Sequence, residues 1–204
     1  MSSDVTGNLI WASVARRLSP STTVGVSGSY TSLTLDDSRI WNVSLFNTYQ
    51  LGNRFSMSGS AGVSVLSSNV TDNEATFTTN TTALYRLGRF LFAVTLDQDF
   101  QQTFTQGQDF GIVLARSYTG SVTYEVTPVI SASVRGGYDD NQITGVGDAR
   151  GTATAFTGEA GLSWQVRRWL AATLNYTYTR YDGNTSSGGV ASANRVVFRL
   201  STTF

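Results

Sequence analysis

Apolar and polar residues alternate one by one through long stretches of this chain, and this period of two most constrains its fold. It runs through residues 41–51, 55–65, 156–166, 170–179 and 195–204. A period of two places successive side chains on opposite faces of a β-strand, whereas an amphipathic helix needs a spacing near 3.6. The sequence therefore predicts an all-β protein whose strands have one apolar and one polar face.

The strands are long, and short and long connections between them alternate. We expect eleven strands, at residues 4–18, 21–35, 39–51, 54–67, 75–87, 89–104, 110–126, 128–139, 151–166, 168–181 and 193–204. Strands of soluble proteins usually have about 5–6 residues. A tilted strand that crosses a bilayer needs about 9–11 apolar-band residues plus wetted ends, which fits these lengths better.

Aromatic residues mark both ends of the apolar faces. Those near the short connections are Tyr49, Phe55, Tyr85, Tyr124 and Trp164, and those near the long ones are Tyr30, Trp41, Tyr138, Phe156 and Tyr178. Two aromatic girdles that bracket an apolar band are typical of strands crossing both bilayer interfaces. An open sheet cannot persist in lipid. We therefore expect residues 1–204 to form one antiparallel, up-and-down transmembrane β-barrel with a polar lumen.

The composition excludes several function classes. The chain has 14 basic residues, all of them Arg, and 14 acidic residues, so its net charge is zero and nucleic acid is not an expected partner. It has no Cys and no His, so disulfides, thiolate sites and a His base are ruled out. We expect no enzyme, no cofactor and no metal site. A hydrolase with paired carboxylates, at Asp97/Asp99 or Asp139/Asp140, is a distant alternative.

The zero net charge conceals a separation of charge along the strands. Arg16, Arg17, Arg54, Arg86, Arg89, Arg167 and Arg168 lie near the short connections, where Glu125 is the one acidic residue. The long connections carry Asp36, Asp37, Asp72, Glu74, Asp109, Asp139, Asp140, Asp148 and Asp182. These acidic residues do not follow the spacing of a calcium-binding loop, so we interpret the segments that carry them as solvated loops.

These features together resemble those of bacterial outer-membrane β-barrel proteins of the porin-like kind. Val196, Phe198, Leu200 and Phe204 look like the C-terminal signal that the barrel-assembly machinery reads in that family, although Thr202 replaces a larger residue. The resemblance covers nearly the whole chain. It implies the outer membrane of a Gram-negative cell, contact with lipid and lipopolysaccharide, short turns in the periplasm and long loops outside.

An odd number of strands conflicts with this resemblance, because single-chain bacterial barrels have an even number. No signal peptide precedes the first strand either. Either the chain lacks its natural N-terminus and one strand, or the count is wrong by one, or the ring closes with an odd number. We expect the first, and thus a ring of 11 or 12 strands. The lipid-facing set of the first strand stays open between Ile10, Ala12, Val14 and Leu9, Trp11, Ala15.

The charged residues on the polar faces are the candidate functional residues. They are Arg86, Asp97, Asp99, Glu125, Arg135, Glu159, Arg195 and Arg199. In a narrow barrel they would pair and plug the lumen, with Arg195 and Arg199 opposite Glu159, Asp97 or Asp99, and in a wider one they would line a selective pore. Arg116 falls on the lipid side, near the outer rim, where it would contact lipid phosphate or mark a local bulge.

Three functions are compatible with this pattern. The leading one is a passive pore or export channel for small polar solutes or ions. The alternative is a non-conducting barrel with a structural or surface-adhesive task, in which the acidic loops bind. The third is a soluble, secreted all-β protein with a sealed apolar core.

Overall fold

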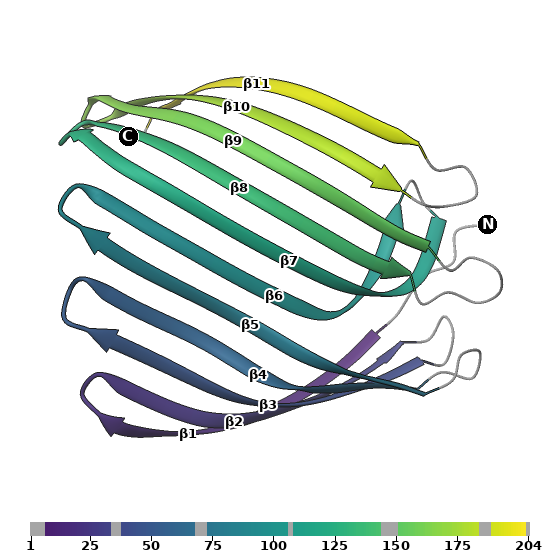
Figure 1. The fold of residues 1–204 in the computed structure, drawn as a ribbon. Helices are drawn as coiled ribbons and strands as arrows, with labels where there is room; N and C mark the ends of the chain where they lie inside the picture. The colour runs from purple at the N-terminus through teal and green to yellow at the C-terminus, as the bar shows by residue number, and fades with distance from the viewer. Residues whose placement is uncertain are drawn as a thin grey trace.

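A computed structural model describes residues 7–33, 38–67, 73–105, 108–143, 151–183 and 189–202. They form a single antiparallel sheet in which each strand pairs with its neighbours in sequence (Figure 1). The strands are β1 (Gly7–Ser19), β2 (Thr22–Leu33), β3 (Ser38–Leu51), β4 (Phe55–Ser67), β5 (Glu74–Leu87), β6 (Phe90–Thr105), β7 (Gln108–Thr127), β8 (Ile130–Ile143), β9 (Gly151–Arg167), β10 (Leu170–Gly183) and β11 (Val190–Thr202).

The all-β, up-and-down architecture and the number of strands, 11 in the described residues, are confirmed. Most strand ends lie within a few residues of the expected ones. Two differ more: β8 continues to Ile143 rather than 139, and β11 begins at Val190 rather than 193. In both cases pairing with β9 or β10 extends the strand past its expected end, because a ladder needs backbone groups rather than a pattern of side chains.

The two faces of the sheet differ as the alternation predicts. On β3, Trp41, Val43 and Leu45 are 56–66% exposed and belong to the face that we call the outer face. The opposite, inner face has the more buried positions, among them Ser64 and Thr78, which are 0% and 5% exposed. Polar side chains are thus shielded while large apolar ones are not, because the sheet curls around its polar side (Figure 1). Two stacked layers with a sealed apolar core, the soluble alternative, are excluded by this arrangement.

The first strand follows the same rule. The pairing of Ile10 with Tyr30 and of Val14 with Val26 places Ile10, Ala12 and Val14 on the outer face. Leu9, Trp11 and Ala15 therefore lie on the inner face. The ambiguity left by the sequence is resolved by register, since β1 has apolar residues on both faces and only its partner strand decides between them.

Tight turns join the strands at the short-connection end. Gly52 and Gly88 have φ values of 56° and 58°, which favour glycine. At the sides of the sheet, β1 and β11 each pair with one neighbour, so the described sheet is open between them. Among the described residues, no helix has the length and apolarity needed to span a bilayer.

Candidate functional site

The inner face is largely polar, and hydrogen bonds between strands connect many of its polar side chains. The Asn42 side-chain amide donates to the hydroxyls of Ser64 and Thr78, at 3.2 Å each. Ser27 and Ser44 share a hydroxyl–hydroxyl bond of 2.7 Å, and other Ser and Thr residues continue the pattern on β5 and β6. Such a surface offers hydrogen-bond donors and acceptors to water, as the polar interior of a water-filled barrel does.

The strand register places all eight predicted charged residues on this inner face. Arg86 on β5 reaches Glu125 on β7 and forms an ion pair with an N–O distance of 3.3 Å. Both side chains are half exposed, at 50% and 54%, so the pair is open to solvent. It crosses β6, which lies between the two strands.

Arg135 and Glu159 are directly opposite each other on β8 and β9. Within the described part of the chain they form no ion pair, and neither do Arg195 and Arg199 on β11. The described residues do not form the suggested pairs of Arg195 and Arg199 with Glu159, Asp97 or Asp99, and this pairing across a closed lumen stays a prediction. These four charged groups stay available on the wall of β8–β11.

Three acidic residues of the inner face, Asp97, Asp99 and Asp139, lie on the half of the sheet nearer the long connections. Asp97 accepts a hydrogen bond of 3.0 Å from the Asn80 amide. Asp99 accepts one of 2.8 Å from the backbone N–H of Phe100, and Asp139 lies on the row of Asp97 two strands away. Among the described residues, no group of three or more possible ligands is arranged to hold a metal ion.

A hairpin formed by the ends of β6 and β7 covers part of the inner face. β6 stops pairing with β5 at Gln98, whereas β6 and β7 stay paired to Thr105 and Gln108. Beyond this point the hairpin bends away from the sheet (Figure 1). Phe100 and Leu114, 7% and 4% exposed, pack against Leu66 of β4 in an apolar cluster. Because β5 separates β4 from β6 in the sheet, the hairpin must fold across the inner face to make this contact.

The outer face carries the ten aromatic residues predicted for the two girdles. Near the short turns, Phe90 stacks on Tyr124 with ring centroids 4.6 Å apart, and Tyr49 contacts Phe55. Near the long connections, the ring centroids of Tyr30 and Trp41 are 4.4 Å apart. Between the girdles lie exposed Val and Leu side chains together with Ala and Gly residues, as expected of a lipid-facing band.

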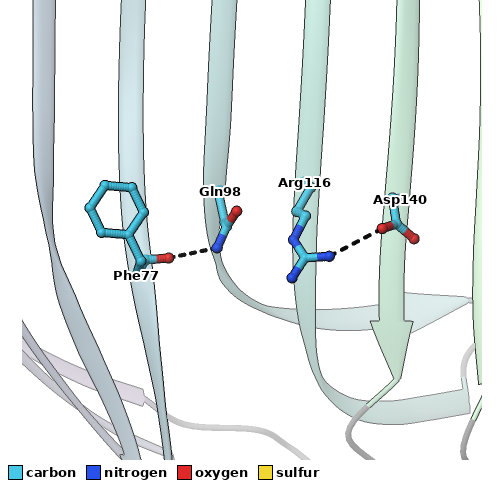
Figure 2. Close-up of polar contacts among 4 residues, drawn as sticks. All are labelled: Phe77, Gln98, Arg116 and Asp140. Carbon is cyan, nitrogen blue, oxygen red and sulfur yellow. Dashed lines mark hydrogen bonds and ion pairs between the residues drawn. The ribbon is translucent and has the colours of Figure 1, made fainter.

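Two polar side chains near the rim of the outer face bond to neighbouring strands (Figure 2). Arg116 pairs with Asp140 at 3.3 Å, and the two side chains are 29% and 22% exposed. The Gln98 amide donates to the backbone oxygen of Phe77 at 2.7 Å, where β6 has left β5. Arg116 thus lies on the predicted face, and its partner is a carboxylate on the adjacent strand. Register shifts in the β7 pairings fall elsewhere, so a bulge at Arg116 is not what places it there.

A family model described as "Putative beta-barrel porin 2" matches residues 90–204, from the start of β6 onward. The chain belongs to this porin family. Porins are outer-membrane β-barrels and generally not enzymes, so the predicted outer-membrane location is confirmed. No curated protein sequence matches the chain.

Solved porins share the fold of this family member at low sequence identity. OmpT of Vibrio cholerae aligns with a TM-score of 0.55 and 14% identity over 94% of this chain and 63% of its own. OccK3 of Pseudomonas aeruginosa aligns with a TM-score of 0.54 and 18% identity over 96% of this chain and 56% of its own. OpdK of the same organism, solved with vanillate, aligns with a TM-score of 0.54 and 13% identity over 97% of this chain and 59% of its own. The chain therefore spans about three-fifths of the length of these porins.

Some predicted residues lie outside the described part of the porin chain. These are Phe204 of the assembly signal and the acidic residues Asp36, Asp37, Asp72 and Asp148; the side chain of Asp109 is also not described. The other members of the assembly signal, Val196, Phe198 and Leu200, lie on the outer face of β11 and are 59–68% exposed. Their recognition by assembly machinery stays a prediction.

The folded hairpin is the feature that sequence reasoning missed. The signal was present in part: the run from Gly111 to Ala115 is one of the longest apolar runs of the chain, and it lies near a long polar connection. An apolar run beyond the aromatic girdle near the long connections does not contact lipid, so other parts of the protein must bury it.

Proposed function

We propose that this porin is a passive pore for small polar solutes or ions, whose path is lined by the inner face. The observation that carries the proposal is the opposite character of the two faces. The outer face exposes Val, Leu and aromatic side chains, and the inner face carries hydroxyls, amides and unpaired charges. A sheet with this polarity is stable in lipid when its inner face encloses water.

Conduction requires that the sheet be closed into a ring. Unpaired backbone groups cost several kcal/mol each in hydrocarbon, so the edges of β1 and β11 are paired in the membrane, with each other or with further strands. In either case the inner face of the strands between them stays toward the lumen, because curvature and register are set by the pairs already formed.

In this proposal, ion selectivity comes from the charged side chains of the inner face that form no ion pair among the described residues. Arg86 is largely compensated by Glu125. Arg135, Glu159, Arg195 and Arg199 are not compensated in this way, and they lie on β8, β9 and β11 of one wall. A charge that faces water in a narrow path attracts counter-ions and repels ions of its own sign.

The test is a recording of single-channel currents in planar bilayers under a salt gradient. We expect Glu159→Gln to shift the reversal potential toward anion preference and Arg135→Gln to shift it toward cation preference. Val122→Ala on the outer face is the matched control and should leave selectivity unchanged. Equal reversal potentials for all variants would remove Arg135 and Glu159 from the path.

A non-conducting barrel is the second candidate, and the folded hairpin favours it. The cluster of Phe100, Leu114 and Leu66 occupies part of the inner face on the side of the long connections. If the hairpin seals the lumen, the refolded protein will give no current steps although it is folded and inserted. The acidic loops would then carry a structural or adhesive task.

A further inference from the structure

The outer face has a hollow over β2–β5. It has a volume of about 470 Å³ and is bordered by Val24, Val26, Leu45 and Met57, with Gly59 and Ala61 at its floor. The pairing of Leu45 with both Val26 and Ala61 confirms that these side chains share the outer face. The hollow exists because β4 carries two of the smallest side chains where its neighbours carry branched ones.

An amide without a partner lies in the wall of this hollow. Asn47 is on the outer face of β3, two residues from the girdle residue Tyr49 and six from Trp41, and it is exposed. In the described part of the chain its side chain makes no hydrogen bond or ion pair. It therefore faces the apolar band, about 7 Å along the strand from the girdle.

Three other polar side chains on the outer face near the girdles have partners among the described residues. Gln98 donates to the backbone oxygen of Phe77, and Arg116 pairs with Asp140. The side-chain oxygen of Asn194 accepts a hydrogen bond of 2.6 Å from the Tyr176 hydroxyl. Asn47 has no such partner, and it lies at the hollow.

We propose that the hollow is the contact surface for a second copy of this chain, with Asn47 of one copy bonded to Asn47 of the other. A primary amide has two donors and one acceptor oxygen, so it is complementary to itself. A two-fold axis along the membrane normal keeps each residue at its own depth and brings identical residues together. Acyl chains offer no acceptor, whereas a second amide offers both donor and acceptor.

The small floor residues serve the same contact. Small side chains let backbones in membranes approach closely, and polar side chains then bond across the interface. With Gly59 and Ala61 at the floor, a ridge such as Met57 of the second copy has a space to enter. Bulk at this floor would hold the two sheets apart and leave the amides out of reach.

The chain has no cysteine, so one introduced thiol reports on one position. We expect Asn47→Cys to form a disulfide-linked dimer in outer membranes under mild oxidation. Val134→Cys, on the outer face of β8, is the matched control and should stay monomeric. A dimer yield of Asn47→Cys no higher than that of Val134→Cys, in protein that migrates as a folded barrel on unboiled gels, would overturn the proposal.

Two further variants separate the amide from the hollow in the otherwise native chain. Asn47→Leu removes the hydrogen bond and should weaken the dimer about tenfold in sedimentation experiments in detergent. Ala61→Phe fills the floor and should abolish the dimer. Monomeric wild-type protein that retains phospholipid in native mass spectrometry would overturn the proposal in favour of a lipid site. Neither variant touches the inner face, so pore currents test the proposed function separately.

Discussion

At the scale of single residues, the ion pair between Arg116 and Asp140 is a charged contact on the side of the sheet that carries the apolar band. It lies on the outer face, beside Tyr118 and the girdle residue Tyr138 of the same two strands. Each side chain is less than a third exposed. Removing one partner leaves the other charge against a poorly hydrated surface, where an uncompensated ion is costly.

We therefore expect Asp140→Asn to destabilise the barrel by about 1–2 kcal/mol, and the double variant Arg116→Gln/Asp140→Asn to cost less than the sum of the single ones. Urea unfolding in lipid vesicles measures the coupling. Arg86 and Glu125 form a matched pair with the same 3.3 Å distance but half-exposed side chains, so their coupling should be smaller. Equal coupling in both pairs would mean that the rim of the outer face is as wet as the lumen.

The sequence located these residues better than it located their contacts. Alternation along β7 was enough to place Arg116 on the lipid side, because successive side chains of a strand point to opposite faces of the sheet. Its partner Asp140 could not be found in this way, since a one-residue slip between β7 and β8 would put that carboxylate on the other face. The same holds for Arg86 and Glu125, whose contact crosses an intervening strand.

At the scale of elements, we expect the hairpin of β6 and β7 to restrict the path along the inner face. Phe100 is 7% exposed although β6 has left the sheet there, so its burial comes from Leu66 and Leu114. Phe100→Ala should cost the hairpin about 3 kcal/mol of packing. We expect larger and noisier single-channel currents as the released hairpin moves.

The control for this prediction is Phe77→Ala, which removes a phenyl ring that is 56% exposed on the outer face. It should leave the currents as in the wild type. Wild-type currents in the Phe100→Ala variant would show that the hairpin does not restrict the path.

The strands themselves were largely predictable, and the bend of the hairpin was not. A strand's existence follows from local alternation and turn residues, which one sequence contains. The departure of β6 from β5 at Gln98 depends on contacts between Phe100 and a strand more than 30 residues away in sequence, Leu66 included. Such contacts depend on tertiary packing, and the one sign of them in the sequence is an apolar run.

At the scale of the whole molecule, the inside–outside assignment of every strand rests on one physical condition, which is that the outer face meets hydrocarbon. Val134 on β8 tests it well, because it is 63% exposed and lies between Ile130 at the short turn and Tyr138 in the outer girdle. In water, a substitution at so exposed a site changes stability by less than about 0.5 kcal/mol. In a bilayer, an Arg there costs about 2–4 kcal/mol.

We expect Val134→Arg to lose most of its folded, heat-modifiable form on unboiled gels and to unfold at lower urea in vesicles. Ser133→Arg, one residue away on the inner face, is the matched control, since its guanidinium would enter a polar lumen that already holds Arg135. The difference between the two variants is the measurement, because each adds the same side chain to the same strand. If both were tolerated equally, the apolar face of β8 would be in water, and the enclosed polar path would have no membrane to cross.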